Sequence, residues 1–159
     1  MSIRFWSQLG VGVGVLVFAT LVSWYEGSAL LDQPWEWRYS TPISGMIHGV
    51  VEGQADIVGL DFFVYAAKFS PFFPGMMIIS TSYLIVLIGF RTFNRSGIRI
   101  FFTLTGVVEI ALGLIISTSP TAGGNLLCWL FLSIGLLLIV LAIVLHFLPF
   151  RMNDHFTHQ

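Results

Sequence analysis

Residues 24–71 read WYEGSALLDQPWEWRYSTPISGMIHGVVEGQADIVGLDFFVYAAKFSP, the one long polar and aromatic interruption in an otherwise apolar chain. Six of the eight acidic residues lie in this segment, together with three of the five tryptophans. A segment of this length without a disulfide is too short for a stable core of its own. We therefore expect it to fold only against the helices that flank it.

The composition is that of a membrane protein. Hydrophobic residues make up 56% of the 159 residues and charged residues only 9%, against about 25% charged residues in soluble domains, and the mean hydropathy is +0.88. The length accommodates a single integral membrane domain over residues 1–159 and leaves no room for a second domain. Because Cys128 is the single cysteine, an intrachain disulfide and a paired-cysteine redox motif are excluded.

Four apolar runs define the architecture. Each has the roughly 18 to 22 residues that, at about 1.5 Å a residue, cross a hydrocarbon core of about 30 Å. The sequence therefore predicts an all-α bundle of four transmembrane helices, with an extracytoplasmic cap at 24–71 between the first two helices and a disordered tail at about 151–159. The expected helices are residues 5–23, 72–90, 100–117 and 126–147.

Basic residues set the expected orientation. If the four helices alternate in direction, five arginines fall on one side of the membrane, which should be the cytoplasmic side; they are Arg4, Arg91, Arg95, Arg99 and Arg151. Both termini are then cytoplasmic and residues 24–71 are outside. Arginines at this level face anionic lipid headgroups and need no nucleic-acid partner. His146, near the inner end of the fourth run, is expected to reach toward the same headgroups.

Local signals divide the segment 24–71. After Pro34, aromatic and charged residues alternate, and this period of two predicts an aromatic ribbon with three rings on one face. Thr41 is placed to cap a short helix that begins at Pro42, and Asp61 to cap a further helix. The rings of this cap form a candidate interaction surface that comprises Trp24, Tyr25, Trp35, Trp37, Tyr39, Phe62, Phe63 and Tyr65.

Glu109 lies near the middle of the third apolar run, where a charged and unpaired carboxylate is costly. We expect it to face the bundle interior and to be either protonated or partnered. The second run carries four hydroxyl groups at a comparable depth that could hydrogen-bond to it: Ser80, Thr81, Ser82 and Tyr83. Two interpretations stay open, a proton or cation relay or ligand anchor, and a protonated structural glutamate. Glu109→Gln should abolish proton-linked activity only under the first and leave folding intact under both.

His48, Glu52 and Asp56 are spaced by four residues, which on one helix would align an imidazole and two carboxylates as metal ligands. The same spacing also places them on the solvent-facing side of the helix, opposite its apolar stripe. Glycines through this stretch argue against a preorganised site, and no second histidine lies nearby in the sequence. We favour a solvated face over a metal site, and we expect no metal and no other cofactor.

The words WYEGSALLDQPWEWRYSTP and LDFFVYAAKFSPFFP resemble a family of small, uncharacterised Bacillus-type multi-pass membrane proteins. The resemblance covers about residues 24–74 and does not extend to the last two helices. Because that family has no established activity, it implies no catalytic residue. It implies a bacterial plasma-membrane protein.

The sequence therefore favours a non-enzymatic accessory or interaction protein that uses its acidic, tryptophan-rich cap. Its partners would be the lipid bilayer and another membrane protein or further copies of itself. The alternative is a small proton- or cation-coupled transporter or channel built on Glu109. A third hypothesis, a metal-dependent enzyme of the membrane interface, depends only on His48 and its neighbouring carboxylates.

Overall fold

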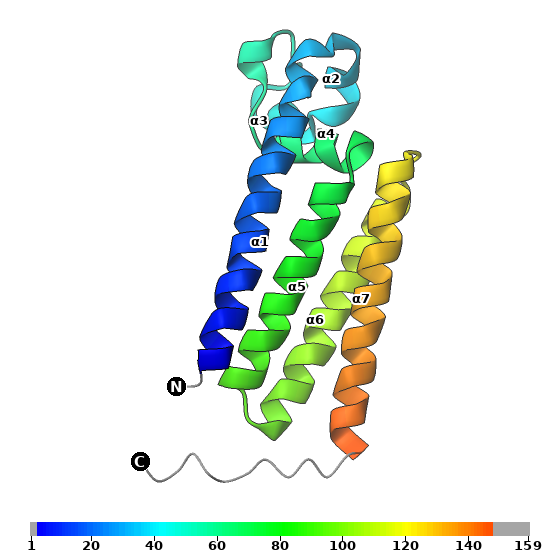
Figure 1. Cartoon of the computed structure of the whole chain (residues 1–159). Helices are drawn as coiled ribbons and strands as arrows, with labels where there is room; N and C mark the ends of the chain where they lie inside the picture. The colour runs from blue at the N-terminus through cyan, green and yellow to red at the C-terminus, as the bar shows by residue number, and fades with distance from the viewer. Residues whose placement is uncertain (1–2, 148–159) are drawn as a thin grey trace.

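Four long helices lie side by side in the computed structural model, and a small helical region covers one end of them (Figure 1). The structure describes residues 3–147; the expected tail at 151–159 lies outside this range, as do Arg151 and the last two histidines. Within it the chain forms α-helices and short 3-10 turns without a strand, which confirms the all-α class. The long helices are α1 (Ile3–Gly27), α5 (Phe72–Thr92), α6 (Arg95–Ile116) and α7 (Ala122–Phe147).

All four long helices are long and apolar enough to cross a membrane. Each is longer than the predicted run, because the helix continues through residues beside the run that are not strongly apolar. At α6, for example, the Asn94 side chain accepts a hydrogen bond from the Gly97 backbone N–H at 2.9 Å, so that the helix begins at Arg95, before the apolar run starts.

The long helices pack mainly as two pairs, α1 with α5 and α6 with α7, while α5 meets α6 and α7 at few points. Small residues form the contacts within the pairs. The backbones of α6 and α7 approach most closely where Gly106 faces Gly135, since a Cβ on either would lie 2.7 Å from the other's carbonyl oxygen. Close packing through small residues is typical of helices that associate in lipid.

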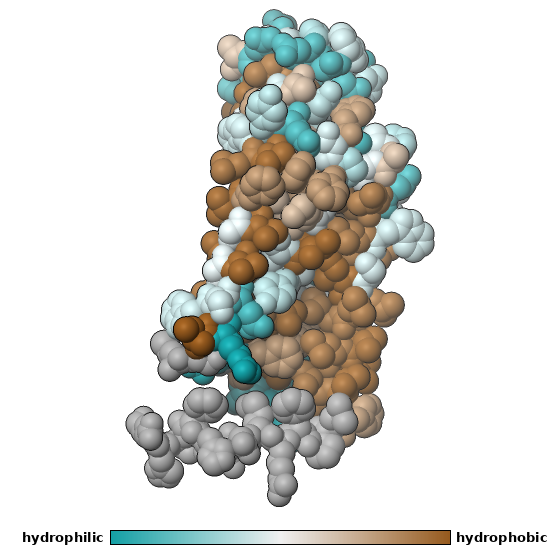
Figure 2. Space-filling model, viewed as in Figure 1, coloured by the Kyte–Doolittle hydropathy of each residue, from teal (hydrophilic) through white to brown (hydrophobic). Residues whose placement is uncertain are grey.

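Large apolar side chains point outward along the helices. Examples are Val11 on α1, Ile115 on α6 and Leu137 on α7, each of which is about two-thirds exposed. Figure 2 shows hydrophobic residues over the middle of the long helices, with hydrophilic residues over the end region and again near the opposite end of the bundle. This pattern of small residues inside and large apolar residues outside is the one expected of a surface in contact with lipid.

The end region is the connecting segment, residues 28–71, which joins α1 to α5 (Figure 1). It contains a 3-10 turn at Ser28–Asp32, α2 (Pro34–Ser40), α3 (Pro42–His48), a 3-10 turn at Gln54–Asp56 and α4 (Asp61–Phe69). It packs on the end of α1 and on the start of α7 through α4.

The prediction of an extended aromatic ribbon after Pro34 is wrong, because these residues form the helix α2. Proline at the first position favours a helix start. The Trp37 indole N–H then donates to the Leu30 carbonyl at 2.9 Å, which turns this ring toward the preceding 3-10 turn. Trp35 and Tyr39 stay exposed, so that the three rings do not share one face.

Candidate functional site

A buried carboxylate holds the connecting segment together. Asp61 is fully buried at the start of α4 and accepts hydrogen bonds from the backbone N–H groups of Ile43 at 3.0 Å and Ser44 at 2.8 Å. The Ser44 hydroxyl also donates to it and accepts from the Val58 N–H at 2.8 Å. Asp61 therefore caps α3, whereas local sequence predicted that it caps its own helix. Thr41 does not cap α3 either, since its hydroxyl donates to the Trp37 carbonyl.

A second polar cluster ties α4 to α2. The Lys68 ammonium lies 3.3 Å from the Glu36 carboxylate and donates to the hydroxyl of the fully buried Ser40 at 2.7 Å. The Ser40 hydroxyl in turn donates to the same Glu36 oxygen. Burial, and to a smaller degree the charge of Glu36, raise the pKa of the neighbouring Tyr65 phenol above its usual range. Hydrogen-bonded charges of this kind fix the spacing between two helices.

Two glycines anchor the segment to the long helices. A Cβ on Gly27, at the end of α1, would collide with the Phe62 carbonyl of α4, and one on Gly123, at the start of α7, with the carbonyls of Ala67 and Lys68. Backbones meet directly at both points, so neither position has room for a side chain. The segment is therefore held between both pairs of long helices.

A groove of about 800 Å³ lies between the connecting segment and the turn that joins α6 to α7. Its walls are mostly apolar, with the Lys68–Glu36 pair at one side, and a concave apolar surface with a few converging polar groups is typical of a binding site. The lining residues are Glu36, Tyr39, Phe63, Val64, Ala67, Lys68, Phe69, Ile115, Ile116, Thr118, Ser119, Pro120, Thr121, Gly124 and Leu127.

The eight aromatic residues expected to form one interaction surface divide into two groups. Trp24 packs edge-on against Phe62 and Phe63, with ring centroids 5.5 and 5.7 Å apart, and Tyr65 packs against Phe69 at 4.7 Å. With Trp37 these rings mainly hold the segment together. Tyr25, Trp35 and Tyr39 are 68 to 78% exposed. Of all eight, only Tyr39 and Phe63 line the groove.

The structure places Glu109 in the bundle interior, 7% exposed, where the Ser82 hydroxyl donates to its Oε1 at 2.9 Å. Its Oε2 is buried without a hydrogen-bond partner. Of the other three hydroxyls, Ser80 donates to the Met76 carbonyl of its own helix. Thr81 is exposed, and Tyr83 lines a groove against α1. Ser82 alone of the four is therefore bonded to the carboxyl.

The proposed metal ligands do not share a helix. α3 ends at His48, and Gly49 then reverses the chain with φ of 81°, which puts Glu52 in the following loop. The Asp56 carboxylate accepts from the Glu52 and Gly53 N–H groups, both at 3.1 Å, and so closes that loop. Across residues 3–147, no three His, Cys, Asp or Glu side chains gather as a metal site would require. The helical alignment on which the metal hypothesis depended is therefore wrong.

The fold and the site together define a class of helical protein with four helices long and apolar enough to cross a membrane and a structured connection between the first two. The family model described as "Domain of unknown function (DUF4306)" matches residues 6–93, more than half of the chain. The chain belongs to this family.

A similar protein is "Uncharacterized protein YjdJ" of Bacillus subtilis (strain 168), which is 38% identical over 80 residues, or 49% of this chain and 73% of that protein. The sequence resemblance to an uncharacterised Bacillus family is thereby confirmed. No solved structure matches the chain. The family match spans α1, the connecting segment and α5 and stops before α6, so that the matched part corresponds to one helix pair.

Sequence reasoning missed the groove, the bridging role of Lys68 and the partner of Asp61. The two walls of the groove come from the connecting segment and from the α6–α7 region, which are more than 40 positions apart in the chain, so no local sequence pattern indicates the groove. Only Lys68 gave a signal, because it is the one lysine in the sequence and lies within an apolar stretch. A charge in such a place indicates a partner, but not which one.

Proposed function

We propose that the protein crosses the bilayer four times, with both termini in the cytoplasm and the connecting segment outside. The apolar length of the four helices and their exposed apolar side chains support this topology. So does the charge distribution, because among residues 3–147 the four arginines at α1 and the α5–α6 turn lie at one end of the bundle and the connecting segment with six carboxylates at or beside it lies at the other.

Cysteine accessibility tests this topology. In a Cys128→Ser background, a cysteine at Gln54 should react with a membrane-impermeant maleimide in intact cells, and one at Thr92 should react only after the cells are opened. The opposite labelling pattern would reverse the topology. Labelling at both positions in intact cells would contradict the single crossing, by α5, that the proposed topology places between them.

We further propose that the protein is a non-enzymatic interaction protein whose groove receives an apolar part of another membrane component. The groove beneath the connecting segment is the observation that carries this function. It lies where the long helices meet the connecting segment, and its apolar walls and single ion pair suit a partner that is apolar with a polar group at its end. Polar contacts within the connecting segment hold the wall that this segment contributes to the groove.

Site-specific photocrosslinking in native membranes tests the proposal. A photoreactive residue at Tyr39, which lines the groove, should give a discrete adduct, and one at Val50, which is exposed on the same segment outside the groove, should not. Val64→Trp, which fills the groove, should remove the adduct, whereas Val50→Trp should leave it. Equal adducts from Tyr39 and Val50 would mean random collision and would refute the function.

A transporter built on Glu109 is the second candidate, and the buried, unpartnered Oε2 supports it. It needs a water-filled path to the carboxyl, and Glu109 lines none of the four grooves described along residues 3–147. Reconstitution in vesicles with a pH-sensitive dye tests it. Proton flux that depends on the protein and is lost in Glu109→Gln would favour the transporter over the interaction protein.

A further inference from the structure

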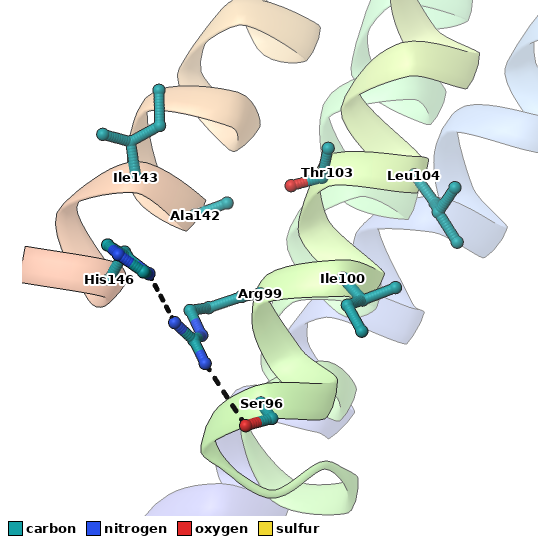
Figure 3. A pocket seen from close by; sticks show the side chains of 8 residues that line it. All are labelled: Ser96, Arg99, Ile100, Thr103, Leu104, Ala142, Ile143 and His146. Carbon is teal, nitrogen blue, oxygen red and sulfur yellow. Dashed lines mark hydrogen bonds between the residues drawn. The ribbon is translucent and has the colours of Figure 1, made fainter.

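At the end of the bundle opposite the connecting segment, α6 and α7 diverge around a groove of about 480 Å³ (Figure 3). Arg99 reaches across it from α6, and its Nη1 donates to Nδ1 of His146 on α7 at 2.5 Å. Its Nη2 donates to the Ser96 hydroxyl and its Nε to the Arg95 carbonyl, both at 3.2 Å. Two residues that are 47 positions apart therefore meet at the mouth of one groove.

Hydrogen-bond donors converge at this mouth. A guanidinium has five N–H donors, and the three bonds described for Arg99 use three of them. Because the Nδ1 of His146 accepts from Arg99, the hydrogen of a neutral imidazole must be on Nε2, which is then a further donor. Bidentate contact with a phosphate is the interaction for which an arginine is best suited.

No carboxylate of residues 3–147 neutralises this end. Those carboxylates lie between Glu26 and Asp61, near the other end, apart from Glu109 in the middle of the bundle. The described salt bridge, Lys68 with Glu36, is also in the connecting segment. The charge of Arg99 is thus complementary to an anion from outside the described chain.

Beyond the donors the groove becomes apolar. Ile100 and Leu104 on α6 and Ile143 on α7 line it, and each is at least half exposed. At about 1.5 Å a residue, Leu104 lies about 7.5 Å further toward the middle of the bundle than Arg99. A phosphate at the mouth with an acyl chain along this wall matches the groove in both charge and polarity, and basic pockets between membrane helices bind anionic lipid headgroups.

We propose that this groove is a binding site for one anionic phospholipid of the inner leaflet, with its phosphate on Arg99 and His146 and an acyl chain between α6 and α7. The proposal goes beyond the groove under the connecting segment, which lies at the other end of the molecule. It assumes the membrane topology proposed above, with this end at the cytoplasmic side, but not the function assigned to that other groove.

Lipid retention by the purified full chain tests the proposal. Protein in mild detergent is incubated with vesicles of equal phosphatidylglycerol and phosphatidylcholine, repurified, and its bound lipid is measured by mass spectrometry. The wild type should retain phosphatidylglycerol about fivefold over phosphatidylcholine, which is the effect of about one well-placed arginine. Arg99→Gln should bring the ratio back to that of the vesicles. Arg91→Gln, at the same end but outside the groove, should leave it unchanged.

Ile143→Trp keeps both donors and fills the apolar wall, so it should lower phosphatidylglycerol retention even if Arg99→Gln fails to fold. A wild-type ratio equal to that of the vesicles would overturn the proposal, as would equal losses in the Arg99 and Arg91 variants, which would indicate only general charge attraction. Inorganic phosphate at millimolar concentration should not displace the lipid, because it lacks an acyl chain. Displacement by phosphate would make this a soluble-anion site and would also overturn the proposal.

Discussion

Two parts of the molecule differ in the contacts that hold them. The family-matched part, α1 with the connecting segment and α5, contains polar contacts that join the short helices of the connecting segment, with Asp61 and Ser40 fully buried and Lys68 partly exposed. The pair α6 and α7 is held by backbone approach at Gly106 and Gly135 and by apolar packing around Phe102. Polar networks specify one arrangement and are costly to disrupt, while packing between large apolar side chains tolerates substitutions that keep the volume. We therefore expect mutations to affect the two parts differently.

The junction between the two parts is narrow. It includes the Ser82–Glu109 hydrogen bond within the bundle and the contact of Gly123 with α4 at the end. The groove under the connecting segment lies at the same junction, with one wall from each part. Changes at the junction should thus alter the groove without unfolding either part.

The largest effect is expected from Asp61→Ala. Three donors in α3 would lose a buried acceptor, which should lower the free energy of unfolding of the family-matched part by about 3 kcal/mol. Chemical unfolding in detergent, followed by tryptophan fluorescence, measures the loss. Asp56→Ala removes an acceptor at the edge of a loop and should cost less than about 1 kcal/mol. A loss no larger for Asp61 than for Asp56 would contradict the polar basis of this part.

Gly123→Ala should have the next largest effect, because the new Cβ collides with two backbone carbonyls of α4. We expect a loss of about 2 kcal/mol and a wider groove. The matched control is Gly14→Ala in α1, where a Cβ meets nothing within 4 Å and should stabilise the helix by up to about 1 kcal/mol. Thermal unfolding of both variants measures the difference. Similar midpoints for the two would mean that the parts do not meet at Gly123.

The Ser82–Glu109 hydrogen bond gives another test of the junction, with a smaller expected effect on stability. Glu109→Gln keeps an acceptor for Ser82 and should be nearly neutral in stability, while Glu109→Leu should cost about 1 kcal/mol. A double-mutant cycle with Ser82→Ala isolates the contact and should give a coupling of about 0.6 kcal/mol. Zero coupling would remove the Ser82 bond from the forces that join the two parts.

The smallest effect is expected from Lys68→Met. The ion pair with Glu36 is partly exposed, with 18 and 22% of the two side chains accessible, so its loss should cost about 0.5 kcal/mol. High salt should reduce the difference between wild type and variant, because it screens exposed charges. Chemical unfolding at two salt concentrations measures this. A cost that matches that of Asp61→Ala would place Lys68 among the main supports of the segment.

The sequence predicted the elements of the candidate site better than its contacts. It indicated a short helix from Pro42 and another near Asp61, and both exist. It did not indicate that Asp61 caps the first of these helices, because Asp61 is 18 and 17 residues away in the chain from its hydrogen-bond partners Ile43 and Ser44. The alternation of aromatic and charged residues around Trp37 gave a wrong prediction of extended structure. A period of two over five residues is a weak signal, and it is outweighed by Pro34, which favours the start of a helix, and by the hydrogen bond of the Trp37 indole.

By itself, the sequence determined the all-α class and four helices of membrane-crossing length, because helix length and hydropathy are properties of consecutive residues. It also placed Glu109 inside the bundle, since exposing a carboxyl to apolar surroundings is costly. Only the tertiary structure decided which of four hydroxyls meets that carboxyl. Successive residues of a helix point about 100° apart, so the four cannot all face one neighbour. The pairing of Arg99 with His146 likewise depends on how two helices lie against each other, which no local pattern contains.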